Sequence, residues 1–206
     1  LSLKTYIKIF VIPFKDNSVG CVGGRIIPTN SKKTLIGYWA HLLADAGAHK
    51  IRKKLSDKDK FLECSGYLFA FRKGLISEIP LNVAEDSYIP YAIFKKDYKI
   101  KYAPNSIVYV KNPTTIKDFV KQRVRTAKAH TSLLQYFENF QAMKSFRNEV
   151  KEGTFNALKY ATTFKEFFWT LFLFFIRLFI WMKVFYDERI ICVYYGDGWE
   201  KVQTTK

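Results

Sequence analysis

The chain has 206 residues, with 34 lysines and arginines against 18 aspartates and glutamates, so its formal net charge is +16. Hydrophobic residues make up 49% of it and aromatic residues 17%, which excludes a disordered tail and leaves enough apolar surface for a core. The three cysteines, Cys21, Cys64 and Cys192, form no CxxC pair, which excludes a disulfide scaffold or a zinc ribbon.

Alternating strand and helix patterns run through the first two thirds of the chain. They predict the end of a helix over 1–10, turns at Pro13 and 16–18, a buried strand over 19–28 and a helix over 38–54. A second strand-like run follows over 61–72, broken at Ser65-Gly66, and then a helix over 84–97. A third extended segment over 99–110 is interrupted at Pro104-Asn105, and the last helix is capped by Thr114 or Thr115 and ends near Leu134. Strands that alternate with helices indicate an α/β layer fold.

Two glycines, Gly23 and Gly24, lie inside the strand predicted over 19–28. Glycine weakens a strand because it has no side chain to pack. A pair of glycines there therefore indicates that a ligand or another stretch of backbone approaches closely.

The aromatic-rich segment 167–185 differs from the rest of the chain, because its polar residues are limited to Thr170, Arg177 and Lys183. As a helix it would be about 28 Å long, enough to cross a hydrocarbon core, but a charge at its middle makes a simple span costly. Glu166, Thr170, Arg177 and Glu188 form one polar stripe on such a helix. Three alternatives remain: a transmembrane helix, a helix in the membrane interface, and the buried core helix of a soluble protein.

The positive charge predicts an anionic partner: nucleic acid, a membrane surface or a phosphate-bearing substrate. Its densest run is 49–60, which is typical of a solvated helix face or loop. No basic recognition helix, RNP-like strand or metal-ligand spacing is evident, so we expect no nucleic-acid partner. Basic residues also precede the aromatic segment, which predicts the cytoplasmic face of a membrane for the upstream domain.

Four patches, in this order, resemble family 2 glycosyltransferases. Residues 19–24 (VGCVGG) are similar to the strand after the family's metal-binding DxD element, and 64–73 (CSGYLFAFRK) to its acceptor-side strand. Residues 84–86 (AED) resemble the (T)ED element, and 122–126 (QRVRT) the Q(Q/R)xRW element of processive members. The tail, 199–206, is a weaker match to the gating segment of membrane-bound members.

This resemblance implies the C-terminal half of a GT-A fold plus a membrane-associated helix. The expected divisions are 1–135 for the catalytic part, 136–165 for a helical connector, 166–186 for an interfacial or transmembrane helix, and 187–206 for the tail. The implied activity is inverting transfer of a sugar from a nucleotide-sugar to a lipid-linked or polysaccharide acceptor hydroxyl. The alternative, from another class, is a non-catalytic basic module that docks on a membrane.

Two features depart from the family pattern. The nucleotide-binding half with its DxD element is expected before residue 1, so the chain looks N-terminally truncated and is expected to be inactive by itself. Asp57-Lys58-Asp59 fits DxD by letter, but it lies in a lysine-rich loop, so we identify no metal ligand although the full-length family member is expected to use Mg or Mn. Thr126 stands where processive members have Trp, which favours transfer of a single sugar.

The resemblance also implies roles for individual residues. Asp86 is the expected catalytic base and Glu85 a supporting residue, with helix capping as the simpler alternative for both carboxylates. The acceptor-binding set is Ser65, Gly66, Arg72 and Trp199, and the donor diphosphate-binding set is Gln122, Arg123, Arg125 and Lys206. Arg125 is the strongest candidate for the diphosphate because its planar fork matches phosphate oxygens, whereas a solvated basic helix is the alternative for 122–125.

Overall fold

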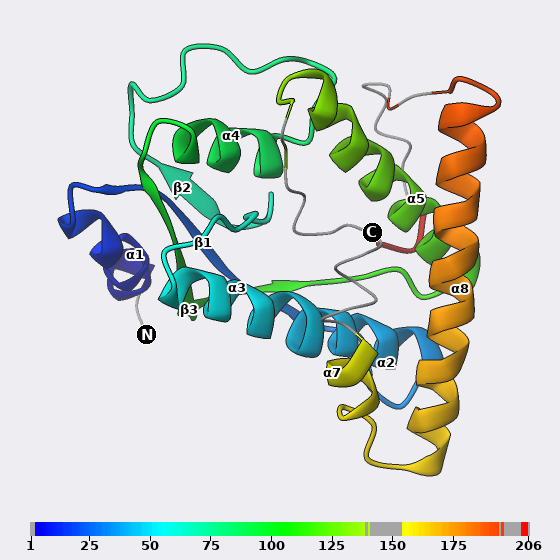
Figure 1. Cartoon of the computed structure of the whole chain (residues 1–206). Coiled ribbons are helices and arrows are strands. Elements are labelled where there is room, and N and C mark those ends of the chain that lie inside the picture. The colour runs from blue at the N-terminus through cyan, green and yellow to red at the C-terminus, as the bar shows by residue number, and fades with distance from the viewer. Residues whose placement is uncertain (1–2, 139, 141–153, 194, 196–202, 206) are drawn as a thin grey trace. The chain divides into compact units, whose positions relative to one another are not determined.

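The structure, a computed structural model, describes residues 3–138, 140, 154–193, 195 and 203–205. The chain divides into two compact units, each built from several segments. The first unit comprises Leu1–Ile27, Ala48–Pro80 and Glu85–Val110, and the second comprises Pro28–Gly47, Leu81–Ala84 and Lys111–Lys206. Figure 1 labels their helices and strands. The divisions at 135, 165 and 186 stay a prediction.

The first unit is a three-stranded sheet with helices around it. Its elements are α1 (Leu3–Val11), a 3₁₀ turn (Ile12–Lys15), β1 (Val19–Pro28), α3 (Lys50–Asp57), β2 (Phe69–Phe71), α4 (Glu85–Phe94) and β3 (Lys99–Val110). The strand order is β2-β1-β3, and β2 runs antiparallel to β1 with Cys21 opposite Phe71. Where β1 and β3 both begin, the Lys99 N–H donates to the Ser18 carbonyl at 2.8 Å, so these two strands run in the same direction.

Gly24 in β1 is required by close packing inside the protein. A Cβ at this position would lie 2.2 Å from Leu68 Cδ2 and 2.9 Å from the Ser106 carbonyl oxygen. The close approach predicted from the glycine pair is therefore an approach of protein atoms. Beside it, Phe10, Val19, Val22 and Ala103 form the buried core of this unit.

Two details of the predicted strands are wrong. Within the run over 61–72, the strand is limited to Phe69–Phe71, and residues 61–68 form neither a helix nor a strand. Several backbone groups of 61–68 bond to side chains instead of to a neighbouring strand. The segment Lys99–Val110 is one continuous strand, with no interruption at Pro104-Asn105. The sheet order places β3 at an edge, where a strand tolerates the missing N–H of a proline.

The second unit is helical. Its elements are α2 (Leu35–Leu42), a π-helical segment (Leu43–His49) whose last two residues belong to the first unit, α5 (Ile116–Thr131), a 3₁₀ turn (Ser132–Gln135), α7 (Thr154–Leu158), α8 (Phe164–Arg189) and a second 3₁₀ turn (Gln203–Thr205). The hydroxyls of Thr34, Thr115 and Thr163 accept backbone N–H groups at the starts of α2, α5 and α8. The prediction of a threonine cap before α5 is confirmed, and the capping residue is Thr115.

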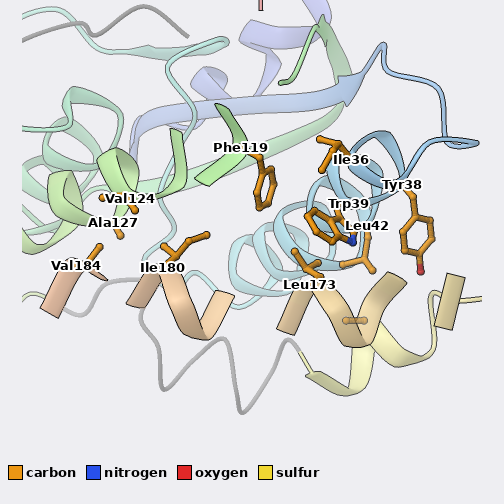
Figure 2. Close-up of a cluster of buried hydrophobic side chains, with 11 residues drawn as sticks. Ile36, Tyr38, Trp39, Leu42, Phe119, Val124, Ala127, Leu173, Ile180 and Val184 are labelled. Carbon is orange, nitrogen blue, oxygen red and sulfur yellow. The ribbon is translucent and has the colours of Figure 1, made fainter. Parts of the chain in front are cut away.

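The core of the second unit lies where α2, α5 and α8 meet. Figure 2 shows Trp39 of α2, Phe119 of α5 and Leu173 of α8 converging there with the other buried side chains of the cluster. Trp39 is fully buried, its ring centroid lies 5.3 Å from that of Phe119, and its indole N–H donates to the Trp169 carbonyl at 2.7 Å. This satisfied donor lets a large aromatic ring be buried without cost from its polar atom.

Candidate functional site

The first part of the candidate site joins the start of α4 to the loop 63–66 in the first unit. Asp86 lies in the first turn of α4 and is half-buried, and Glu85 beside it is exposed. The backbone N–H of Gly66 donates to Asp86 Oδ2 at 3.1 Å, and the N–H of Cys64 donates to the Asp86 carbonyl at 3.1 Å. Among the residues that the structure describes, no donor contacts the other carboxylate oxygen, Oδ1.

Gly66 leaves open space beside the two carboxylates. A Cβ at this position would lie 3.6 Å from Glu85 Oε1 and 3.9 Å from Asp86 Oδ2, which are ordinary contact distances. A larger side chain would therefore extend over these carboxylates, whereas glycine keeps them accessible. Ser65, next to it, is buried. The structure thus brings together two residues of the predicted acceptor-binding set, Ser65 and Gly66, and the two predicted catalytic carboxylates.

A buried arginine holds this loop from the protein interior. Arg52 of α3 is 3% exposed, and its Nε and Nη2 donate to the carbonyls of Glu63 and Cys64 at 2.8 and 2.6 Å. Because each bond is charge-assisted, the carbonyl side of the loop is firmly fixed. Arg52 belongs to the basic run 49–60, for which a solvated helix face or loop was expected, and for this residue that expectation is wrong. The sequence could not indicate its burial, because a single arginine in a lysine-rich segment looks like its solvated neighbours.

A pair of buried thiols joins the same loop to β1. The Sγ atoms of Cys21 in β1 and Cys64 are 3.6 Å apart, and both residues are fully buried. The hydrogen bond with Cys64, together with burial, raises the pKa of the Cys21 thiol well above its usual range. Cys21 is therefore protonated at neutral pH, and this pair packs as small apolar groups.

Arg72, predicted to bind an acceptor, is used for a structural purpose in the first unit. Its guanidinium donates to the carbonyls of Phe14, Asp16 and Val19 at 2.6, 2.9 and 2.8 Å, and lies 5.5 Å from the Phe14 ring centroid. These bonds tie the end of β2 to the turn before β1. An acceptor-binding role for Arg72 stays a prediction.

A separate group of candidate residues lies on α5 in the second unit. Gln122, Arg123 and Arg125 are all half-buried. The Arg123 guanidinium lies 5.3 Å from the ring centroid of Phe119, one helical turn earlier. Thr126, in the position of the family's Trp, uses its hydroxyl to donate to the Gln122 carbonyl at 2.9 Å. The diphosphate-binding roles of this helix stay a prediction.

The described part of the tail returns to the start of α5. The N–H and hydroxyl of Thr204 both donate to Asp118 Oδ2, at 3.1 and 2.6 Å, and the Thr114 N–H donates to the Thr204 hydroxyl at 3.2 Å. Thr204 was noted in the sequence analysis as part of the tail, but its partner Asp118 was not. The other two predicted tail residues, Trp199 and Lys206, lie outside the described residues.

Helix α8 has two different faces. The face with Leu173, Ile180 and Val184 is buried against α2 and α5, and it includes part of the polar stripe. The Thr170 and Tyr38 hydroxyls are 2.8 Å apart there, and the Thr131 hydroxyl donates to Glu188. The opposite face exposes large apolar side chains, among them Phe164, Phe168, Phe175, Met182 and Phe185. Within the described residues, α8 is therefore not buried all round, because half of its residues are exposed.

An ion pair fixes the C-terminal end of α8 to α5. Lys128 Nζ lies 2.8 Å from Asp187 Oδ2, with both side chains about nine-tenths buried, and it also donates to the Val193 carbonyl at 3.1 Å. Lys183 on α8 contacts the other oxygen of Asp187 at 3.2 Å. The hydrogen bond from Lys128, supported by the one from Lys183, holds the pKa of Asp187 below its usual value.

The described residues do not offer a metal site. Within the described ranges, no group of three or more His, Cys, Asp or Glu side chains is arranged to hold a metal ion. Asp59, from the DxD-like triplet, accepts two ion pairs, from Lys101 at 2.5 Å and from Lys99 at 3.3 Å. The described residues therefore do not fit a divalent metal ion. Use of Mg or Mn by the full-length family member stays a prediction.

Comparison with protein families identifies one relationship. The model of a family described as "Glycosyl transferase family group 2" matches residues 13–196. The match contains all four patches listed in the sequence analysis and extends through α8. Comparison with curated proteins gave no significant match.

Proposed function

The chain belongs to glycosyl transferase family group 2, and we propose that it carries the acceptor-side part of the active site of an inverting transferase. The transferred group is a hexosyl residue of a nucleotide-sugar, and the acceptor is a hydroxyl of a lipid-linked or polysaccharide molecule. The observation that carries this proposal is the Asp86 carboxylate, which is fixed through Oδ2 and has no donor at Oδ1 among the described residues.

In the proposed reaction, Asp86 acts as the general base. The acceptor oxygen forms a bond to the anomeric carbon of the sugar, the bond from this carbon to the diphosphate breaks, and the hydroxyl proton passes to Asp86 Oδ1. Attack from the face opposite the leaving group inverts the configuration. The N–H of Gly66 on Oδ2 fixes the rotation of the carboxylate, which is the contribution of a positioned base.

The remaining predicted residues have supporting roles in this proposal. Glu85, exposed beside Asp86, contributes negative charge and a second acceptor, and Ser65 and Gly66 shape the acceptor approach. From α5, Arg125 together with Gln122 and Arg123 stabilises the charge that develops on the departing diphosphate. Lys206 and Trp199, which lie outside the described residues, keep their proposed donor and acceptor roles.

Helix α8 supports the proposal that the protein works on a membrane, on the cytoplasmic face. By length and composition α8 is the one helix of the described part long and apolar enough to cross a bilayer, and 22% of its most apolar window is buried. Its packing favours an interfacial position, because α5 carries half-buried and exposed cations and a hydrocarbon core would not accommodate this partner. The return of Thr204 to Asp118 points the same way, since a span would carry the tail away from α5.

The test of the proposed function is Asp86→Asn in a transferase that joins this chain to a donor-binding half of the family's type. We expect kcat to fall by roughly 10²- to 10⁴-fold, because asparagine keeps the shape but cannot accept the proton. Asp97→Asn, an exposed carboxylate just beyond the other end of α4, is the matched control and should leave kcat unchanged. Full activity of folded Asp86→Asn would refute the assignment of Asp86 as the base. A folded joined protein that transfers no sugar even with Asp86 intact would favour the alternative, a non-catalytic membrane-docking module, which the exposed face of α8 supports.

We also expect the 206-residue chain alone to transfer no sugar. This expectation rests on the absence from its sequence of a DxD element in the family's context. An assay with the chain alone, purified and folded, that detects sustained transfer would overturn it.

A further inference from the structure

The helix that carries the proposed base contains a proline at an informative position. Pro90 lies inside α4, four residues after Asp86. In an α-helix the N–H of residue 90 would donate to the carbonyl of residue 86. Proline has no N–H, so α4 itself supplies no such donor to the Asp86 carbonyl.

The loop 63–66 supplies the missing donor. The Cys64 N–H donates to this carbonyl at 3.1 Å, and two residues later the Gly66 N–H donates to the carboxylate of the same aspartate, also at 3.1 Å. Asp86 therefore receives both N–H groups through two different acceptors, one on its backbone and one on its side chain. Because the loop has no regular structure, these bonds take the place of a strand partner.

The opposite edge of the loop is already fixed. Arg52 holds the carbonyls of Glu63 and Cys64 from the interior, so the peptide groups of this loop have a defined orientation. With its carbonyls fixed by Arg52, the loop presents its N–H groups to Asp86. The loop thus contacts Asp86 at two points, the backbone carbonyl through Cys64 and the carboxylate through Gly66.

We propose that Pro90 is a positioning residue for sugar transfer, which leaves the Asp86 carbonyl for Cys64 and thereby holds the base against the acceptor loop. This inference rests on the proposed function, in which Asp86 is the base. An N–H at position 90 would compete with Cys64 for the carbonyl, loosen the loop and let the carboxylate rotate. Pro90 itself contacts no reacting atom in this proposal.

The proposal predicts separate effects on stability and on catalysis. Pro90→Ala gains helix propensity but removes buried ring atoms, and because these two effects oppose each other we expect a melting temperature close to that of the wild type. The same variant should lower kcat by roughly 10- to 100-fold, because a misplaced base loses catalytic efficiency steeply. The KM for the nucleotide-sugar should stay unchanged, because the donor does not depend on this loop. A purely structural proline would give no such split.

The experiment uses the joined transferase described above and compares three variants with the unmodified protein. The first variant, Pro90→Ala, restores a backbone N–H at position 90. The second has the same alanine side chain but an ester in place of the amide at residue 90, so it has no N–H there and should keep most of the wild-type kcat. Pro104→Ala in β3 is a matched control, a second proline in a regular element of the first unit, and should change neither parameter. Each variant is measured for melting temperature, kcat and donor KM.

The outcomes separate this inference from the function on which it rests. If Asp86→Asn keeps full activity, the proposed function fails first. If Asp86→Asn is inactive while Pro90→Ala keeps wild-type kcat, the positioning role of Pro90 fails alone. Equal losses of kcat in the amide and ester variants would also overturn it, because the proline would then act through its ring.

Discussion

The exposed face of α8 makes a quantitative prediction about membrane binding. Phe168 and Phe175 lie on this face and are 65% and 68% exposed. Full burial of a phenylalanine side chain is worth about 2 to 3 kcal/mol, so burying the exposed two thirds in a bilayer interface contributes about 1.5 kcal/mol for each residue. Replacing both by serine should therefore weaken binding by about 3 kcal/mol, which is roughly 100-fold in the partition coefficient.

The assay is co-sedimentation of the chain with vesicles of phosphatidylcholine, with and without phosphatidylglycerol. We expect stronger binding to the anionic vesicles, decreasing with salt, because the net charge is +16. Tyr109→Ser is the matched control, since this aromatic residue of β3 is as exposed as Phe175 but lies outside α8. The melting temperature should not change in any of these variants, because each side chain is mostly exposed.

The reasoning would be refuted by a folded Phe168→Ser/Phe175→Ser variant that binds vesicles as tightly as the wild type. An equal loss of binding in Tyr109→Ser would also refute it, because binding would then reflect exposed aromatic surface in general. Resistance of the bound wild-type chain to alkaline extraction would contradict the interfacial position and indicate a span.

The remaining predictions concern stability, measured by thermal or urea unfolding. Lys128→Met removes a buried partner of Asp187 and should cost about 3 kcal/mol, near the low end for a buried pair because a second lysine still contacts this carboxylate. Folding lowers the pKa of Asp187, so its contribution to the free energy of unfolding is present above its unfolded pKa of about 3.9 and is lost as the pH falls through the lower folded value. The difference in stability between the variant and the wild type should therefore shrink in that acid range. A pH-independent difference would contradict this reasoning. Gly24→Ala places a Cβ against Leu68 and should cost about 1 to 3 kcal/mol by overpacking; a wild-type unfolding midpoint would show that β1 relaxes freely.

Much of the local structure could be predicted because it depends on neighbours in sequence. The strand over 19–28 follows from its apolar run, and its bounds are those expected. The start of α5 follows from a threonine that can cap its own helix, and the long helix around 167–185 follows from its composition. The Glu85-Asp86 pair and the Ser65-Gly66 break were likewise visible in the sequence, although their contact was not.

The sequence by itself determined the family patches, the positive charge and the alternation of strands and helices, because each is a property of short segments. Tertiary structure decided which face of α8 is buried, since a helix with apolar residues almost all round has no unique packing side until α2 and α5 select one. It also decided that 61–68 bonds to Asp86 and Arg52 instead of forming a strand, and that Thr204 pairs with Asp118. These contacts join residues 11 to 86 positions apart, and no local pattern encodes such a distance in space.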